Sequence, residues 1–346
     1  MKRRWLAVLA ALALVAAAGL TAAAYAVDRS RSDQLADGVT VAGLDVGGMH
    51  VEDARALLRR RIVRRLERPV VVRDARRSFR LTAARAGVRV DLDGMLDAAL
   101  DQSRDGHFLT RVYREATGGR VEARIRLRVS YSHRAVVAFV NRIARKIDRP
   151  ATSATLVPYV SYLATTPSHD GVAVARRALV RAIEARLVRT RSRRVLGLPT
   201  RVVRPEVSTA DLPEKYPVYV TVDRNAKVLR LFERLRVARS YRIAVGRAGL
   251  ETPAGVYTID DKQVNPSWHV PNSPWAGELA GKVIPPGPDD PIKARWLGIY
   301  NGAGIHGTDN VASLGTAASH GCIRMSIPDV IELYDRVPFG TPVYIA

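Results

Sequence analysis

A chain of 346 residues exceeds the size at which single hydrophobic cores stop growing, roughly 250–300 residues, so two domains are expected. Its hydrophobic content of 47% excludes global disorder, and its net charge of +22 predicts attraction to an anionic partner. Residues 215–346 carry 15 basic and 12 acidic side chains, a net of +3, which leaves +19 for residues 1–214. Nucleic acid, a membrane face and an anionic cell-wall polymer are the candidate partners.

The N-terminus indicates export. Three basic residues at positions 2–4 precede an uncharged apolar run over residues 5–27, and about 20 helical residues span a bilayer. The basic residues should stay cytoplasmic, which puts everything after Asp28 outside the cell membrane. The sequence AYA ending at Ala26 also fits a cleavable signal peptide, although the apolar run exceeds the roughly 7–15 residues of a signal core. We therefore expect a single-pass anchor at 1–27, and export together with only 6% aromatic residues argues against nucleic acid.

A polar tether at 28–36 leads into residues 37–205, which are predicted to form an α+β binding or spacing module. Val39–Val46 alternates as a strand does, and a helix follows from Val51 until Pro69 ends it. The segments PVVVRD and SFRLT predict a hairpin, and Asp91 or Asp93 begins a second helix. The segment ATLVPYVSYLATTP is strand-like, and GVAVARRALVRAIEARL is helical. The histidines of the module are scattered and are predicted to be surface or capping residues: His50, His107, His133 and His169.

The composition changes again at residues 206–216, where Pro, Ser, Thr and Asp predict a linker. Beyond it, residues 217–346 read as short strands with tight turns, for example PVYVTVD, RNAK and VLRLFE. Two more strands are predicted in RSYRIAVG and TPAGVYTI, and a helix only at IPDVIELYDRV. This second domain is therefore expected to be mainly β, as a sandwich or barrel-like fold.

The stretch IHGTDNVASLGTAASHGCIRM contains Cys322, the only cysteine of the chain. An inert buried thiol is one interpretation, but exported proteins pair their cysteines in disulfides, so a lone cysteine favours a reactive thiol. An imidazole such as that of His306 or His320 can take the thiol proton and later protonate a leaving amine. The N–H groups of Gly321 and Cys322 could stabilise an oxyanion, and Arg324 could hold a substrate carboxylate. A zinc site is the alternative, with His306, His320 and Cys322 as ligands, but no fourth ligand is obvious in the sequence.

These motifs resemble a known family. IHGT followed by SHGCIRM resembles the signature of the L,D-transpeptidase (YkuD-like) catalytic domain, and TPAGVYTI and YPVYVTVDRNAKVLRLFE are similar to two further segments of it. The stretch VTVAGLDVGGMHVEDARALL resembles the VanW-associated peptidoglycan-binding modules that precede such domains. The resemblance implies a β-sandwich-like domain at 217–346 whose cleft lies under a lid, here NPSWHVPNSPWAGELAGKVIPPGPDDP.

The resemblance also implies a role for each site residue. Cys322 would be the nucleophile and His306 the general base and acid, with its ring oriented by the main-chain carbonyl of Gly307. His320 would support the site, and Ser319 and Gly321 would shape the turn at the nucleophile. Three residues are expected to contact substrate: Arg324, Tyr257 and Trp268. No metal and no cofactor is expected, and His269 is a lesser candidate for substrate contact.

The implied reaction is acyl transfer on peptidoglycan stem peptides. The enzyme would release D-Ala from a tetrapeptide through a thioester and pass the acyl group to an acceptor amine, giving a 3-3 cross-link. Water as acceptor would make it an L,D-carboxypeptidase, and a lipoprotein lysine would make it an anchoring enzyme. A catalytically inactive, membrane-tethered wall-binding protein is the non-enzymatic alternative. Acylation of Cys322 by carbapenems is expected, and the catalytic domain should face the cell wall, where an anionic polymer is a possible partner.

Overall fold

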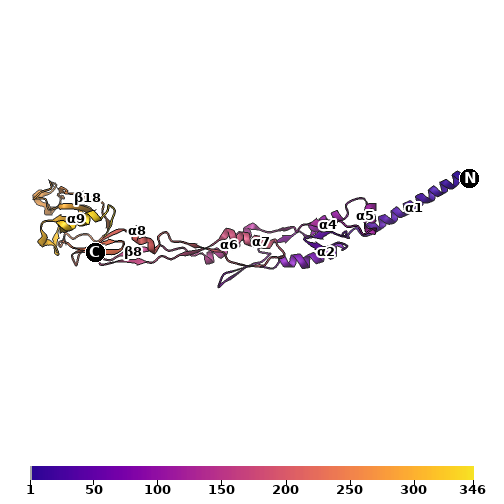
Figure 1. Ribbon diagram of the computed structural model, residues 1–346, viewed down its shortest axis with the longest axis horizontal. Coiled ribbons are helices and arrows are strands. Elements are labelled where there is room, and N and C mark those ends of the chain that lie inside the picture. The colour runs from indigo at the N-terminus through magenta and orange to yellow at the C-terminus, as the bar shows by residue number, and fades with distance from the viewer. Residues whose placement is uncertain (1) are drawn as a thin grey trace. The chain divides into compact units, whose positions relative to one another are not determined.

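The computed structural model describes residues 2–346, with side chains described from residue 8 onward, and it divides into two compact units (Figure 1). Unit 1 comprises the chain up to Asp148 together with Val172–Arg201, and unit 2 comprises Arg149–Gly171 together with Val202–Ala346. The predicted module at 37–205 is therefore not one continuous block, because residues 149–171 belong to unit 2. The basic side chains at positions 2–4, predicted to be cytoplasmic, lie outside the described residues.

The N-terminal helix α1 (Lys2–Ser30) carries the predicted anchor. Its segment Val8–Ser30 is long and apolar enough to cross a membrane, and the window that meets this criterion has no residue buried in the protein. A signal sequence near an N-terminus has the same length and composition, so this helix alone is weak evidence of an anchor. The helix continues through Ala26, the possible cleavage position, without a break.

The first half of unit 1 packs helices on a small sheet. The predicted helix after Val51 is confirmed, and a π-helical turn interrupts it, so it reads α2 (Val51–Leu58), η1 (Arg59–Val63) and α3 (Arg64–Leu66). It contacts α4 (Leu92–Ser103), whose N-cap Asp91 accepts from Gly94 N–H at 3.0 Å. The sheet pairs β1 (Thr40–Val41) with β2 (Leu44–Asp45) and with β6 (Arg124–Ile125). Leu58, Leu66 and Met95 are fully buried between these elements.

The second half of unit 1 places two helices beside a three-stranded sheet. This sheet has the order β11 (Val195–Gly197), β3 (Val70–Arg73), β4 (Ser78–Leu81), which confirms the predicted hairpin. Figure 1 shows α6 (His133–Ile147) and α7 (Arg176–Leu187) side by side, and their apolar faces share one core. The remaining elements are α5 (Phe108–Ala116) and the pairs β5 (Arg89–Val90) with β7 (Val129–Ser130) and β10 (Gly171–Val174) with β12 (Thr200–Val203).

Unit 2 is mainly β, as predicted, and two sheets share its core. The five-stranded sheet has the order β15 (Arg236–Arg242), β14 (Val228–Glu233), β13 (Val218–Asp223), β25 (Pro342–Ile345), β17 (Gly255–Thr258). The four-stranded sheet has the order β18 (Asp261–Val264), β21 (Lys293–Tyr300), β22 (Ala303–Thr308), β24 (Ile323–Ser326). Helix α9 (Ile327–Arg336) buries Val330 and Leu333 in the same core.

Short elements complete unit 2. They are β16 (Val245–Gly246) paired with β23 (Ala317–Ser319), β19 (Trp268–His269) paired with β20 (Val283–Ile284), and the 3₁₀ turns η3 (Pro274–Leu279) and η4 (Val311–Ser313). The expected lid is therefore partly ordered, because β19 and β20 form a hairpin that encloses η3.

The segment 149–171 joins unit 2 through its hairpin, β8 (Thr155–Pro158) with β9 (Leu163–Thr166). The Val160 carbonyl at the hairpin turn accepts from Thr221 Oγ1 at 2.8 Å and from Arg230 Nη1 at 2.9 Å. The expected linker 206–216 is also structured, as η2 (Thr209–Asp211) and α8 (Leu212–Lys215), with Leu212 fully buried. A buried leucine and a Ser208–Asp211 capping box fix the conformation of this segment, so the stretch predicted as a linker has regular structure.

Candidate active site

Unit 2 contains a cavity of about 700 Å³ between the four-stranded sheet and the segment 265–291. Six of the nine predicted site residues line it: Trp268, His306, Ser319, His320, Cys322 and Arg324. The structure thus brings together, from β19, β22, β24 and the loop before β24, residues that are up to 56 positions apart in the chain. His269 lines the same cavity.

Strand register explains why these side chains converge. His306 on β22 pairs with Arg324 on β24 and with Trp296 on β21, and Trp296 pairs with Gln263 on β18. Residues that are directly opposite in neighbouring strands project from the same face of a sheet, so these four side chains form one row across it. All four line the cavity.

The turn between β21 and β22 sets this register. Asn301 and Gly302 both have positive φ, 43° and 77°, as a two-residue hairpin turn of type I′ requires. An irregularity between Gly298 and Tyr300 then shifts the pairing by one residue and brings Trp296 opposite His306. The two rings are stacked, with centroids 6.1 Å apart and an interplanar angle of 25°.

The imidazole of His306 is buried and held in one tautomer. Its Nδ1 lies 2.8 Å from the carbonyl oxygen of Gly307, and because a carbonyl only accepts, Nδ1 carries the proton. The other nitrogen, Nε2, then has a free lone pair. Burial lowers the pKa of His306 to about 4, the charge of Arg324 adds to the effect, and the Gly307 carbonyl opposes it. At neutral pH the ring is an uncharged base.

The thiol of Cys322 is also uncharged at rest. Burial raises its pKa, while a hydrogen bond from the Gly304 N–H and the charge of Arg324 act in the opposite direction. The sulfur lies 3.9 Å from the carbonyl oxygen of Gly302. The resting pair is therefore a neutral thiol and a neutral imidazole, and a thiolate forms at Cys322 only when a base takes the thiol proton.

Gly304 provides the space in which this arrangement fits. The Ile305–Ile323 pairing puts Gly304 opposite Cys322, two residues before His306 and on the same face of β22. A Cβ on Gly304 would lie 2.6 Å from the ring of Trp296 and 2.7 Å from the Leu297 carbonyl oxygen. The indole of Trp296 therefore lies over the glycine, beside the imidazole.

Gly304→Ala is expected to destabilise unit 2 by about 1–3 kcal/mol and to slow the chemistry of Cys322, because both Trp296 and a backbone carbonyl would have to move. Denaturant unfolding and thiol reactivity would measure the two effects. The matched control is Gly197→Ala in β11, where an added Cβ meets nothing within 4 Å. Equal stability of the two variants would contradict the steric argument.

Ser319 braces the turn before Cys322. Gly321 has φ +114°, a conformation that side chains of L-residues rarely adopt. The buried Ser319 hydroxyl accepts from the Gly321 N–H at 3.2 Å and donates to the Cys322 carbonyl at 2.5 Å. Of the two N–H groups expected to stabilise an oxyanion, that of Gly321 donates to Ser319 in this structure.

The segment 265–291 covers the other side of the cavity. The ring of Trp275 in η3 stacks on His320, with centroids 4.3 Å apart and an interplanar angle of 25°. Burial lowers the pKa of His320, and the charges of Arg247 and Arg324 lower it further. His320 is therefore in contact with the expected lid.

One predicted substrate contact is misplaced. Tyr257 is not among the described residues that line the cavity, because it lies on β17 of the five-stranded sheet. Its hydroxyl donates to the Ala254 carbonyl at 2.9 Å and its ring lies against Tyr300.

Sequence reasoning also missed several residues that line the cavity, among them Asp261, Gln263 and Trp296. The Asn-Gly dipeptide at 301–302 could have placed Trp296 in the site. It predicts a hairpin, which brings the strand that carries Trp296 against the strand that carries His306. Within the described part of the chain, no three His, Cys, Asp or Glu side chains are grouped as metal ligands would be.

Two family profiles and several known proteins match parts of this chain. A family profile described as "L,D-transpeptidase catalytic domain" (YkuD) matches residues 217–345, and one described as "Putative peptidoglycan binding domain" matches residues 79–196. The protein named "Putative L,D-transpeptidase YkuD" of Bacillus licheniformis is 38% identical over 134 residues, which are 38% of this chain and 68% of that protein. Its namesake in Bacillus subtilis is 39% identical over 137 residues, 39% of this chain and 70% of that protein.

Solved structures were found as well. L,D-transpeptidase 3 from Mycobacterium tuberculosis is 18% identical, with a TM-score of 0.32, over 38% of this chain and 61% of that one. The catalytic domain of an E. faecium L,D-transpeptidase acylated by ertapenem is 26% identical, with a TM-score of 0.31, over 38% of this chain and 97% of that one.

Proposed function

This chain belongs to the L,D-transpeptidase family with a YkuD catalytic domain, and from that premise we propose that it is a cysteine-dependent peptidoglycan L,D-transpeptidase. Cys322 would be the nucleophile and His306 the general base and acid. The observation that carries the proposal is the neutral His306, with Nδ1 held by Gly307 and Nε2 unprotonated, in one cavity with Cys322.

The first half-reaction follows from these protonation states. Cys322 Sγ attacks the carbonyl carbon of the third residue of a tetrapeptide stem, and its proton passes to His306 Nε2. The tetrahedral intermediate collapses as the bond to D-Ala breaks, and the imidazolium returns the proton to the leaving amine. A thioester on Cys322 and free D-Ala result, and His306 is neutral again.

The second half-reaction needs an amine. The side-chain amine of an acceptor stem attacks the thioester, His306 removes its proton, and the Cys322 thiol leaves with a 3-3 cross-link formed. Asp261 and Asp289 line the cavity and would attract an ammonium group, which gives up one proton to solvent and then attacks as the neutral amine. Hydrolysis and transfer to a protein lysine are the alternative fates of the same thioester.

Arg324 would hold the carboxylate of the departing D-Ala. It lines the cavity beside Cys322, and among the described residues no carboxylate lies within 4.0 Å of its guanidinium. A guanidinium in a cavity binds a carboxylate through charge-assisted hydrogen bonds, each stronger than a neutral one.

Arg324→Ala is expected to raise KM for tetrapeptide donors about 10–100-fold, because a hydrogen bond to a charged group contributes about 1.5–3 kcal/mol. Steady-state kinetics of D-Ala release would measure it. Arg324→Lys, which keeps the charge but loses the paired donors, should fall between wild type and the alanine variant. An unchanged KM in the alanine variant would remove Arg324 from the donor site.

The function is tested by incubating the full chain in detergent with disaccharide-tetrapeptides and analysing products by mass spectrometry. Loss of D-Ala, a new dimer and an acylated peptide containing Cys322 are expected. Loss of D-Ala without a dimer would indicate a carboxypeptidase. No product from a folded, reduced protein would favour a wall-binding protein without activity.

Carbapenems should acylate the same thiol, since their strained lactam carbonyl offers the Cys322–His306 pair an alternative acyl donor. The intact mass of the wild-type protein should rise by the mass of one carbapenem. Blocking Cys322 with a thiol reagent beforehand should prevent the increase. An unaltered mass of the unblocked protein would count against the proposed nucleophile.

The location proposed for this enzyme is the outer face of the cell membrane. Helix α1 would be the anchor, with its basic N-terminus in the cytoplasm and both units outside. The segment 79–196, which matches the peptidoglycan-binding profile, lies in the strongly basic N-terminal part of the chain. This module would hold the enzyme at peptidoglycan and at anionic wall polymers.

A further inference from the structure

Helix α5 (Phe108–Ala116) has an apolar side that the protein leaves largely exposed. No residue of this helix, all of which is described, is buried. Leu109 is 45% exposed and Tyr113 is 71% exposed. These two residues are four positions apart, so they lie on one face of the helix, next to each other along its axis. Exposed apolar stripes of this kind mark surfaces that contact another phase or molecule.

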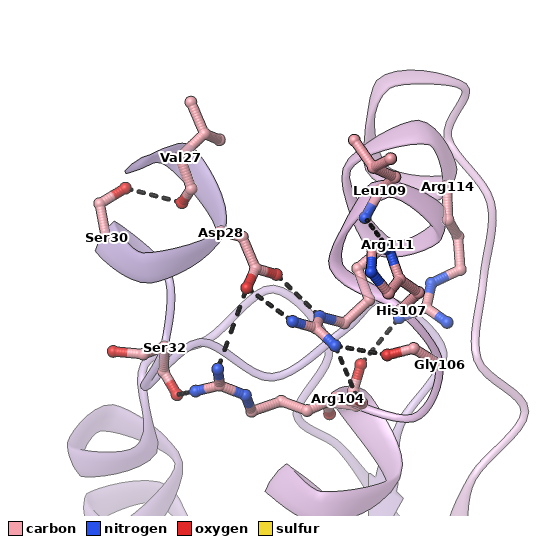
Figure 2. Close-up of polar contacts among 11 residues, drawn as sticks. Val27, Asp28, Ser30, Ser32, Arg104, Gly106, His107, Leu109, Arg111 and Arg114 are labelled. Atoms are coloured by element: carbon pink, nitrogen blue, oxygen red, sulfur yellow. Dashed lines mark hydrogen bonds and ion pairs between the residues drawn. The ribbon is translucent and has the colours of Figure 1, made fainter. Parts of the chain in front are cut away.

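An ion pair ties α5 to the outer end of α1. Figure 2 shows the Arg111 guanidinium against the Asp28 carboxylate, with Nε to Oδ1 at 2.7 Å and Nη2 to Oδ2 at 2.6 Å. Both side chains are largely buried, with 15% and 12% of their surface exposed. Arg104 lies 4.0 Å from the same carboxylate and donates to the Ser32 carbonyl at 3.0 Å. A two-pronged arginine–carboxylate pair in a shielded position fixes orientation as well as distance.

An aromatic contact sets the level at which α5 lies. The ring of Tyr25 on α1 meets the ring of Phe108 edge to face, with centroids 5.9 Å apart. Tyr25 lies two residues before the end of the uncharged run at Val27, the depth at which tyrosine and tryptophan gather in membrane proteins. Because Phe108 is the first residue of α5, the helix begins where α1 leaves the apolar layer.

We propose that α5 lies on the outer surface of the membrane crossed by α1, with Leu109 and Tyr113 inserted at the headgroup level. The occupant of this apolar face is the bilayer itself. A short helix with an apolar stripe and basic residues, here including Arg111 and Arg114, has the composition of interfacial helices. The inference rests on the proposed anchor.

The experiment uses the full chain with Cys322→Ser, so that a single introduced cysteine carries an environment-sensitive fluorophore. Tyr113→Cys places the label on the apolar side, and Glu115→Cys, on the opposite side of the same helix, is the matched control. Each protein is reconstituted in equimolar phosphatidylcholine and phosphatidylglycerol vesicles. The label at 113 should emit at shorter wavelength and be quenched severalfold more by doxyl-labelled lipids than the label at 115. Leu109→Cys, a second position on the stripe, should behave as Tyr113→Cys does.

Vesicle flotation separates the possible failures. A protein that does not float with the vesicles overturns the anchor and with it this inference. A protein that floats while the labels at 109 and 113 emit as in water overturns the interfacial position of α5 alone. Adding Arg111→Gln to the Tyr113→Cys protein should leave flotation unchanged and reduce quenching, because it removes the two-pronged ion pair with Asp28 and leaves only the Tyr25–Phe108 contact and the Arg31–Glu115 pair to hold α5. Unchanged quenching would show that the ion pair does not position the helix.

Discussion

Replacing Cys322 with alanine is expected to abolish D-Ala release, with a fall in rate on the order of 10⁶-fold, as for other catalytic nucleophiles. The chain has no second cysteine to substitute for the lost thiol, so no thioester should form. The fold should persist, because the side chain borders a cavity rather than filling the core. Product analysis, intact mass and thermal unfolding of the same sample would measure all three consequences.

Cys322→Ser is the matched control for the alanine variant, because it keeps the size of the side chain and removes only the thiol. The hydroxyl keeps the size of the thiol but is a poorer nucleophile, so this variant should bind tetrapeptide and fail to turn it over. Release of D-Ala by the alanine variant at a measurable rate would contradict covalent catalysis at this position. The attacking group would then have to be a water molecule or another side chain.

His306→Gln is expected to lower the rate of thioester formation about 10²–10⁴-fold, the usual contribution of a general base. Glutamine can still donate to the Gly307 carbonyl, so the structure should be kept while the basic nitrogen is lost. The matched control is His269→Gln, which makes the same replacement in the lining of the same cavity. Single-turnover acylation should be slow in the first variant and near wild type in the second. Equal rates would contradict the assignment of His306.

The pH dependence of the wild type gives an independent check on His306. The ring must be neutral to accept the thiol proton, and its pKa of about 4 keeps it neutral well below the range of an ordinary histidine. The acylation rate should therefore hold as the pH falls past about 6.5 and should be lost only as it approaches 4. A loss centred near 6.5 would mean that the base is an exposed histidine.

The sequence predicted those parts of the fold that depend on local patterns. Ala54, Leu58, Ile62 and Leu66 recur at helical spacing, and all four are buried. The alternating valines of β13 and the Asp91 cap are equally local signals. The pattern of His306 and Cys322 was specific enough to indicate the family, because both motifs are short and contiguous.

The errors arose where distant residues decide the outcome. The hairpin at 155–166 belongs to unit 2 because Val160 bonds to residues 61 and 70 positions away, which no local pattern reveals. Trp296 faces His306 only because an irregularity shifts the register of β21, and alternation alone would not place it there. Helix α5 went unassigned because it is short and buries no residue that would give its sequence a helical apolar pattern.

The uncharged resting state of Cys322 has a consequence for the lifetime of the protein in its proposed location, outside the cell membrane. Peroxides and disulfides react with thiolates, and a thiol kept protonated by burial is oxidised slowly. Without a second cysteine in the chain, an oxidised Cys322 could not be rescued as an internal disulfide. Activating the sulfur only when a substrate carbonyl arrives would therefore preserve each molecule through long idle periods in an oxidising environment.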